Sequence, residues 1–426
     1  MADGIAAAVD AQRGMAGDLF DALRRDGAAN LGVSRDPYGA GEQRAHATAE
    51  RAARALGLEI SRDAAANTYM TWPGRNRGAR QIVIGSHLDS VPNGGNFDGA
   101  AGVVAGLAAV AALQQAGVQP ACDVVVMGIR AEESIWFQVS YLGSRGALGT
   151  LPEGAMDARR VDTGRPLAEH VRECGGDPVS LAAGVRHLDP ATIRAFVEVH
   201  IEQAPSLVAA ELPVAICTGI PGNFRYAEAR IIGRNDHVGL GRRFRADAGL
   251  AGADFHTAMD ALWLEHEARG VKMACTLGKF HTDAAQHGLT VVPGAFSFSL
   301  DVRAYDEAVL VALERRMLAI IAGIEARRGV RFELGPRASA AVGVVDEGVR
   351  AGLVRAAAAM GVTVMDLGSP ASHDAAAFAA CGVPMGMLFI RNENGSHNPD
   401  EAMEMDDFLA ATRVLTAWLA DAVVDR

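Results

Sequence analysis

The sequence concentrates histidine and carboxylate side chains at the end of one apolar segment, and these side chains are common ligands of divalent metals. The run 82–86 is rich in β-branched residues and predicts a buried strand, with His87 and Asp89 directly after it. The glycine-rich stretch that follows lets the backbone turn and return Asp98 to the same place, before an apolar segment at 100–113 that predicts a helix. Imidazole and carboxylate together suit zinc, manganese or cobalt. Taken alone, this stretch fits a metal site about as well as it fits polar residues that only stabilise a core.

Two adjacent glutamates follow a second apolar run. Residues 123–129 predict a buried strand, and the chain then delivers Glu132 and Glu133. Adjacent carboxylates point in different directions, so one can bind a metal while its neighbour faces a substrate. For the glutamates alone, a solvated acidic loop is the simpler interpretation. Because both apolar runs end in polar residues, we expect His87 and the glutamates to share one rim of a sheet.

Histidines accompany two further predicted strands. His200 lies within the apolar run 196–201, with Glu198 and Glu202 on its own side of the pleat. His397 lies in a later loop that follows an apolar run, and asparagine and proline residues fix the turn there. Both histidines are therefore expected near the same rim as His87.

Together these segments supply enough ligands for two divalent ions that share a bridging carboxylate. The candidate ligands are His87, Asp98, Glu133, His200 and His397. Glu132 then remains free to act as a general base, and Asp89 would orient His87. The convergence of so many ligand types at strand ends argues against a purely structural role for all of them.

Composition and charge exclude several other classes of protein. The 426 residues carry a net charge of −11, and the short arginine-rich spot at 241–245 is isolated, so the basic stripe needed for nucleic-acid binding is absent. The five cysteines are scattered and form no Cys-x-x-Cys motif, which fits free thiols in a reducing compartment. The N-terminus lacks a basic signal-peptide region, and no run of 18 apolar residues suggests a membrane span. We therefore expect a cytoplasmic protein that binds neither nucleic acid nor membrane.

The element pattern predicts an α/β protein with two domains, because a chain of this length exceeds one ordinary core. Alternating strands and helices in residues 1–212 and 332–426 predict a catalytic α/β domain with a mixed sheet. Residues 213–331 predict a smaller inserted α+β sandwich of the split-βαβ kind, with long helices at 246–268 and 305–328.

Finer boundaries follow from the local pattern of apolar and polar residues. In the inserted domain this pattern predicts strands at 214–220, 225–233, 273–280 and 296–303. Near the C-terminus it predicts a last helix at 402–424.

The chain resembles the di-zinc amidohydrolase and peptidase family that contains aminoacylase, N-carbamoyl-L-amino-acid amidohydrolase, β-ureidopropionase and allantoate amidohydrolase. The resemblance is carried, in family order between about residues 80 and 404, by GSHLDSVPNGGNFDG, AEESIWFQVSYLGSRGALG, VEVHIEQAPSL, NDHVG, VVPGAFSFSLDVR, SHDAAAF and GSHNPDE. The HIEQ and SYLGSR segments are similar to the carbamoylase and allantoate branch rather than to ordinary peptidases. The resemblance implies two divalent ions per chain, with zinc expected first and manganese, cobalt or nickel as alternatives.

The resemblance also implies roles for residues outside the ligand set. His237 of the inserted domain would polarise the scissile carbonyl, from the partner chain of a homodimer in which this domain serves for closure and dimerisation. Arg303 would clamp a carboxylate of a small anionic substrate through its bidentate fork. Substrate contacts are implied for Gln203, Arg303, Thr290, Ser372 and His373.

Three departures from the family pattern fall among the implied substrate contacts. The usual HAGTTPM loop is replaced by a loop that begins at His237 and is one residue shorter before Asp247. Thr290 stands where the family has asparagine, and Ser372 where it has glycine. The candidate ligands keep the family pattern, so the chemistry is expected to be retained while the substrate is altered.

The leading hypothesis is hydrolysis of a linear amide bond in a carboxylate-bearing N-carbamoyl or ureido compound, with water activated by Glu132. An N-acyl-amino-acid deacylase or dipeptidase is the alternative within the same chemistry, against which the HIEQ segment argues. A non-catalytic metal-binding or scaffold protein is the hypothesis from another class, and the retention of Glu132 beside the ligands argues against it.

Overall fold

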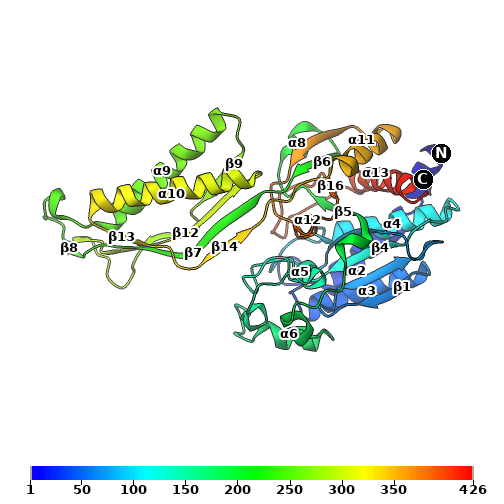
Figure 1. Cartoon of the computed structure of the whole chain (residues 1–426), viewed down its shortest axis with the longest axis horizontal. Helices are drawn as coiled ribbons and strands as arrows, with labels where there is room; N and C mark the ends of the chain where they lie inside the picture. The colour runs from blue at the N-terminus through cyan, green and yellow to red at the C-terminus, as the bar shows by residue number, and fades with distance from the viewer. Residues whose placement is uncertain (1, 425–426) are drawn as a thin grey trace. The chain divides into compact units, whose positions relative to one another are not determined.

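The protein folds into two compact units, one of which is inserted into the other (Figure 1). The computed structural model describes residues 2–424. The first unit comprises Met1–Ile220 and Gly343–Arg426, and the second comprises Pro221–Val342. Within the described residues, no helix combines the length and the apolar character that crossing a membrane requires.

The first unit is built on a mixed sheet of eight strands. In order across the sheet these are β1 (Glu59–Arg62), β2 (Thr68–Trp72), β4 (Val124–Ile129), β3 (Gln81–His87), β5 (Ile193–Ile201), β16 (Met385–Ile390), β6 (Val214–Gly219) and β15 (Val364–Gly368). The four central strands β4, β3, β5 and β16 are parallel to one another, whereas β2 and β6 run antiparallel to their central neighbours. The central strands are almost wholly buried, because helices and loops cover both faces of such a sheet.

Most of the long helices of the first unit share the largest apolar core with this sheet. They are α1 (Ala2–Asp10), α2 (Arg13–Asp26), α3 (Ala40–Ala55), α4 (Ala100–Gln115), α11 (Glu347–Ala359) and α13 (Met405–Ala422). Helix α4 is buried on all sides because its residues are small and apolar all round, and it packs between the sheet and α13. The remaining helices of this unit are α5 (Leu142–Leu148), α6 (Leu167–Glu173), α7 (Pro178–Ala182), α8 (Ser206–Ala210) and α12 (Asp374–Ala380), with 3-10 turns at Ala155–Asp157 and Pro190–Thr192.

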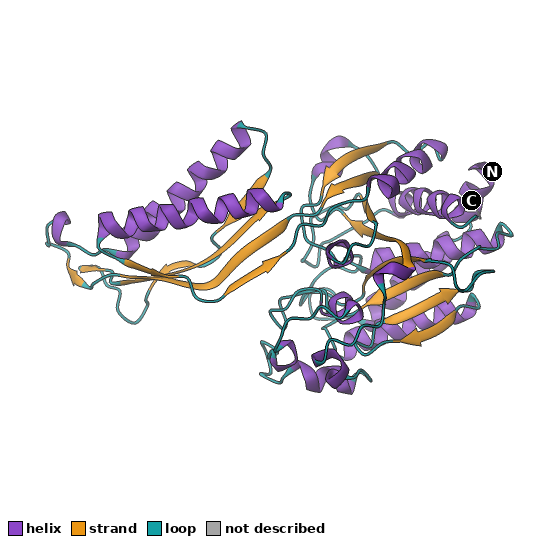
Figure 2. Ribbon diagram, in the orientation of Figure 1, coloured by secondary structure: helices purple, strands orange, loops and turns teal. Residues whose placement is uncertain are grey.

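The second unit is an antiparallel sheet covered on one face by two long helices (Figure 2). Its strands are β7 (Gly222–Ile232), β9 (Met273–Thr276), β10 (Phe280–Thr282), β12 (Ala295–Ala304), β13 (Arg331–Glu333) and β14 (Arg337–Ala340), and its helices are α9 (Ala248–Ala268) and α10 (Glu307–Arg328). A separate small ribbon pairs β8 (Asp236–His237) with β11 (Val291–Val292), and a 3-10 turn covers Arg242–Phe244. Every second residue of β12 is buried beneath the helices, as in a strand with one face on a core.

The mixed α/β fold with an inserted α+β unit is confirmed, but several boundaries differ from the prediction. The predicted insert, 213–331, gives way to Pro221–Val342, because β6 pairs with the large sheet while β13 and β14 pair with β7. The single strand expected at 273–280 is divided into β9 and β10, which both pair with β12. The final helix begins at Met405, not at 402.

Candidate metal centre

The parallel central strands bring the predicted ligands to one edge of the large sheet. His87 is the last residue of β3, and His200 is the penultimate residue of β5. Glu133 follows the end of β4, and His397 follows the end of β16. Since all four strands run in the same direction, their carboxyl ends meet, which is where open α/β sheets place their ligands.

Asp98 lies between two groups of potential ligands. Its Oδ1 is 3.1 Å from His200 Nε2 and 3.5 Å from His87 Nε2. Its Oδ2 is 3.2 Å from His397 Nε2, which in turn lies 3.3 Å from Glu133 Oε1. In each of these groups of three residues, the ligand atoms lie within 4.8 Å of one another, and Asp98 belongs to both. The five side chains that the sequence singled out are thus brought together, with one carboxylate common to two sets.

The two buried histidines turn the same ring nitrogen toward Asp98. The Nδ1 atom of His87 lies 3.1 Å from the carbonyl oxygen of Asp89, and that of His200 lies 2.9 Å from the carbonyl oxygen of Ile201. Carbonyl oxygens only accept hydrogen bonds, so each Nδ1 carries the proton. Each Nε2 is therefore the nitrogen that can offer a lone pair to a metal at the cluster.

Glycines let the loop around Asp98 approach its neighbours closely. Gly99 has a φ of +65°, and a Cβ atom there would lie 2.5 Å from His87 Nδ1. A Cβ on Gly95 would lie 2.1 Å from the carboxyl carbon of Glu401. That carboxylate accepts hydrogen bonds from the backbone N–H groups of Phe97 and Asp98, at 2.9 and 3.3 Å. These two glycines are needed because backbone and side chains meet here without space for a methyl group.

Arg35 holds the same loop from beneath, and no sequence signal pointed to it. Its side chain is fully buried. Its Nε donates to the carbonyl oxygen of Leu88 at 2.8 Å, and its Nη atoms donate to the side chain and carbonyl of Asn96 and to the carbonyl of Asp98. One guanidinium group thus fastens both ends of the segment that carries Asp89 and Asp98.

Glu42 performs the corresponding role for the glutamate loop, and it too was missed. Its carboxylate accepts hydrogen bonds from the backbone N–H of Ala131 at 2.9 Å and from Arg130 Nη1 at 2.7 Å. Arg130 also donates to the carbonyl of Ala66. Because Glu42 and Arg130 are both buried and paired, their charges satisfy each other while they fix the backbone that leads to Glu132.

Three residues of the site adopt left-handed backbone conformations that are uncommon for side chains other than glycine. They are Ala131, Gln203 and His397, with φ values of +54°, +63° and +61°. Such conformations cost on the order of 1–3 kcal/mol each and persist where surrounding contacts impose them. Their concentration in loops that carry Glu132, Gln203 and His397 marks this edge of the sheet as functional.

Gln203 contacts Asp98 directly. Its Nε2 donates to Asp98 Oδ2 at 3.0 Å and lies 3.4 Å from His397 Nε2. Ser396 donates to the same Asp98 oxygen at 3.0 Å. The predicted substrate residue Gln203 is therefore at the centre, next to a candidate ligand.

Ser372 and His373 also lie beside the cluster, at the start of α12. The ring of His373 is buried, 4.4 Å from the ring of His200, and its Nε2 lies 2.9 Å from Ser369 Oγ. Ser372 is half-buried. Glu198 lies close to both rings, since the ligand atoms of Glu198, His200 and His373 lie within 4.8 Å of one another. It accepts from Ser86 and from the backbone of Ala375, which ties β5 to β3 and α12.

The buried carboxylates of the centre would be stabilised by a bound cation. Burial raises the pKa of Glu132 well above its usual value, and the nearby Glu133 raises it further. Burial also raises the pKa of Glu133 to about 7. Burial opposes ionisation of Asp98 as well, but the close imidazole rings of His200, His397 and His87 outweigh it and lower the pKa of Asp98 well below its usual range. Buried carboxylates that repel one another are stabilised by a bound cation.

The donor set fits a divalent metal. Asp98 Oδ1 is buried and has no hydrogen-bond partner, although two imidazole nitrogens lie within 3.5 Å of it. A metal ion would satisfy that oxygen and the imidazole lone pairs together. Mixed nitrogen and oxygen donors are the set that zinc and its neighbours in the periodic table use in hydrolases.

The second unit carries the other predicted residues, at its two ends. His237 in β8 is exposed and lies beside Thr290, since the backbone N–H of Val238 donates to the carbonyl of Thr290 at 2.9 Å. Arg303 is the penultimate residue of β12 and lies opposite Asn223 of β7 in the sheet. Its Nε donates to Asp301 at 2.9 Å. Figure 1 shows β8 and β9 at opposite ends of this unit, and β9 is the strand that pairs with the Arg303 end of β12.

A buried centre of histidines and carboxylates at the carboxyl edge of a mixed sheet defines a metal-dependent hydrolase, and comparison with known proteins places the chain in one family of that class. Peptidase family M20/M25/M40 matches residues 83–421. An N-carbamoyl-L-amino acid amidohydrolase from Geobacillus stearothermophilus is 34% identical over 392 residues, which cover 91% of this chain and 93% of the relative. An allantoate amidohydrolase from Bacillus subtilis is 29% identical, covering 94% and 96% of the two chains.

A solved structure supports the same placement. The crystal structure of a hydantoinase/carbamoylase family amidase from Burkholderia ambifaria superposes with a TM-score of 0.81 at 28% identity, over 97% of this chain and 98% of that one. The chain belongs to peptidase family M20/M25/M40, a metal-dependent family. It is a hydrolase that acts on C–N bonds of amides.

Proposed function

We propose that the protein hydrolyses an N-carbamoyl or ureido compound that carries a carboxylate. The relatives named above act on N-carbamoyl amino acids and allantoate, both of which combine a ureido group with a carboxylate. The observation that best supports this chemistry is the place of Asp98 between two groups of ligands, because a shared carboxylate is the usual bridge between two metal ions.

The proposal assigns a role to each residue of the centre. Two divalent ions, zinc first among them, are held by His87, Asp98, Glu133, His200 and His397. When bound, the ions polarise the scissile carbonyl and lower the pKa of water. Glu132 takes the proton from the attacking water and passes it to the departing nitrogen. Asp89 fixes the loop that carries Glu132, and His373 and Gln203 border the space for the substrate.

The second unit supplies the remaining contacts, and its geometry favours two chains per active site. Arg303 binds the carboxylate of the substrate, and His237 donates to the carbonyl oxygen as negative charge develops there. Between Ala295 and Arg303 the strand β12 extends roughly 26 Å, at about 3.3 Å per residue. Since His237 and Thr290 lie beyond the Ala295 end, one copy of this unit cannot place them and Arg303 on one small substrate. A homodimer, in which the partner provides His237 and Thr290, removes this conflict.

The altered residues favour a substrate other than the common N-carbamoyl-α-amino acids. Thr290 offers one hydroxyl donor where an asparagine amide offers two, and Ser372 adds volume beside His373.

The decisive experiment is a substrate screen on the metal-loaded enzyme. N-carbamoyl, ureido, N-acyl and dipeptide compounds are compared with zinc, manganese, cobalt or nickel present, and release of ammonia or amine is measured. We expect turnover of a carboxylate-bearing ureido compound, and Arg303→Ala should raise its KM without changing the metal content. Preferred hydrolysis of N-acyl amino acids or dipeptides would refute the proposed substrate class. Efficient turnover of ordinary N-carbamoyl-L-amino acids would refute the altered specificity.

A further inference from the structure

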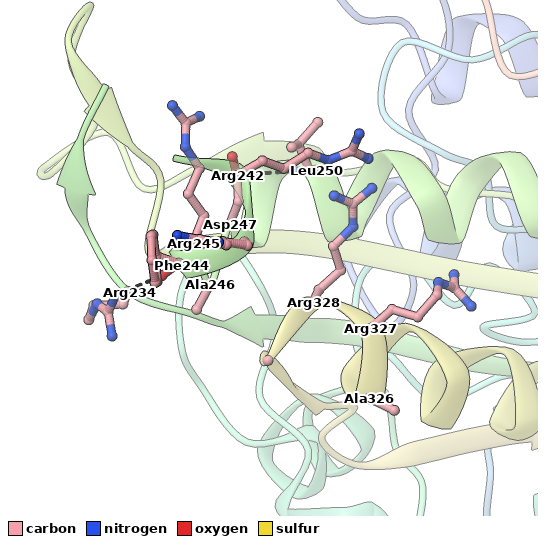
Figure 3. Close-up of a pocket in the computed structure, with 12 residues that line it drawn as sticks. Arg234, Arg242, Phe244, Arg245, Ala246, Asp247, Leu250, Ala326, Arg327 and Arg328 are labelled. Carbon is pink, nitrogen blue, oxygen red and sulfur yellow. Dashed lines mark hydrogen bonds between the residues drawn. The ribbon is translucent and has the colours of Figure 1, made fainter. Parts of the chain in front are cut away.

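A pocket lies within the second unit, and arginines dominate its lining. It has a volume of about 870 Å³ and lies between the segment 234–250 and the end of α10. The arginines that line it are Arg234, Arg242, Arg243, Arg245, Arg327 and Arg328. Figure 3 shows Arg234 and Arg327 at opposite sides of the pocket, with Arg328 extending from the end of α10 between them.

Only some of these guanidinium groups are neutralised by carboxylates. Arg328 forms a bidentate pair with Asp254, both contacts at 2.9 Å, and Arg234 donates to Asp236 at 2.8 Å. Arg245 is occupied by the carbonyl oxygens of Leu240 and Val238, which carry no net charge. These contacts hold the arginines in place and leave much of their charge uncompensated.

Arg242 and Arg243 have no carboxylate of their own: Asp254, which attracts Arg242, already pairs with Arg328 and lies 3.9 Å from Arg327 Nη2. Among residues 2–424, neither forms an ion pair with a carboxylate, and Arg243 stacks on the ring of Phe244 at 4.6 Å. The only acid in the lining itself is Asp247, whose side chain caps α9 by accepting from the backbone of Leu250. Six guanidinium groups face three carboxylates, those of Asp236, Asp247 and Asp254, so three positive charges remain.

This charge contrasts with the acidity of the rest of the chain. Residues 221–342 contain 16 lysines and arginines and 14 aspartates and glutamates, whereas the remaining residues contain 24 and 37. A positive concavity in an acidic protein raises the local concentration of anions. It also requires a counter-charge, because arginines that share one space repel one another.

The shape and chemistry of the pocket define the class of anion. Guanidinium forks bind phosphate and carboxylate oxygens through paired hydrogen bonds. Three uncompensated charges match a ligand of two or more negative charges. Phe244, Leu250 and Ala326 add apolar surface for an organic part, and a volume of about 870 Å³ exceeds what inorganic phosphate would fill.

We propose that this arginine pocket, which is lined by residues of the second unit alone, binds a phosphorylated small molecule with at least two negative charges. Arg242 and Arg243 provide the main phosphate contacts, and Arg327 and Arg328 approach from the opposite wall. The proposal does not depend on which amide the enzyme hydrolyses.

The test measures binding of fructose 1,6-bisphosphate to the full-length metal-loaded protein by calorimetry, at a fixed ionic strength of roughly 150 mM. Fructose is the uncharged control ligand. We expect saturable binding of the bisphosphate, and in the double variant Arg242→Ala/Arg243→Ala a dissociation constant raised by roughly tenfold or more. The matched control, Arg269→Ala/Arg331→Ala, removes the same charge from exposed positions of the same unit outside the pocket and should bind as the parent protein does.

A further variant keeps the test valid if the double variant folds poorly. Arg327→Ala changes the opposite wall, far along the chain from the loop that carries Arg242, and should weaken binding by roughly threefold or more. Circular dichroism verifies the fold of each variant. Binding no stronger than that of fructose, or equal weakening in the control variant, would overturn the proposal. A third result would also overturn the proposal: the parent protein does not bind the bisphosphate, and the double variant no longer self-associates. The arginines would then serve to bind a second copy of the chain.

Discussion

Asp89 accepts hydrogen bonds from the backbone N–H groups of both Glu132 and Glu133, one with each carboxylate oxygen, at 3.1 and 3.0 Å. Its Oδ1 also lies 3.5 Å from His87 Nδ1. This one buried carboxylate therefore positions three side chains: the proposed base Glu132, the proposed ligand Glu133 beside it, and the proposed ligand His87 on the neighbouring strand. The sequence pointed only to the contact with His87.

Replacing Asp89 with asparagine should impair this arrangement without removing bulk. The amide keeps one acceptor oxygen and turns an NH₂ group toward a backbone N–H, so one of the two hydrogen bonds is lost. We expect turnover to fall by roughly 10- to 100-fold and metal affinity to weaken. The matched control is Asp63→Asn, because Asp63 is also buried and also accepts from a backbone N–H, that of Asn67, but lies outside the ligand cluster. Equal losses of activity in both variants would contradict a specific role for Asp89.

The neighbours Glu132 and Glu133 should respond differently to the same change. Glu132→Gln keeps the shape but removes the proton acceptor, so we expect turnover to fall by roughly 100-fold or more while the metal content stays unchanged. Glu133→Gln removes a charged ligand, and metal should be lost together with activity. Elemental analysis beside single-turnover kinetics separates the two cases. Near-normal turnover of Glu132→Gln would move the proton-transfer role to another residue.

Arg35 should act on the metal centre through position alone. Arg35→Met leaves the carbonyls of Leu88, Asn96 and Asp98 without their donor, and we expect a loss of about 3 kcal/mol in the free energy of unfolding. Metal affinity should also fall, since Asp98 is then less firmly placed. The control is Leu353→Ala in α11, which opens a cavity in the apolar core of the first unit. It should lower the free energy of unfolding by about 3 kcal/mol as well, but without affecting metal binding. Parent-like metal affinity in Arg35→Met would refute the positioning role.

The metal content itself can be measured. We expect two divalent ions per chain, complete loss of activity on chelation, and recovery when zinc, manganese, cobalt or nickel is returned. His397→Ala should lose one ion more readily than the other, because His397 belongs to only one of the two ligand groups and is half-exposed, whereas His200 is buried in the other. A single ion in the fully active protein would contradict the two-ion proposal.

The sequence predicted the candidate ligands but not the residues that support them, and the difference has a physical reason. Histidines and carboxylates at the ends of apolar runs are recognisable locally, so His87, Asp98, Glu133, His200 and His397 could be proposed and are found together. Arg35 and Glu42 act on segments 53 to 89 residues further along the chain, and no local pattern distinguishes them from surface charges.

The boundaries of the second unit were mistaken for a related reason. Strand β6 has the same apolar character as the strands of the small sheet, and only its pairing with β16 and β15 assigns it to the large one. Strands β13 and β14 are short and largely exposed, and they belong to the small sheet because they pair with β7. Strand pairing depends on distant segments, and the local alternation of residues does not determine it.

Mixing two inactive variants tests whether each active site uses two chains. Glu132→Gln lacks the proposed base in the first unit, and His237→Ala lacks the proposed carbonyl donor in the second, so each homodimer should be inactive. If His237 acts across the dimer, a hybrid dimer holds one site that lacks both groups and one site that lacks neither. Random reassociation at equal concentrations makes half of the dimers hybrid, and activity should return to about 25% of the parent level. The control mixes Glu132→Gln with Asp89→Asn, which damage the same unit and should not complement each other. Absence of recovery in verified hybrid dimers would show that His237 does not serve the partner's site.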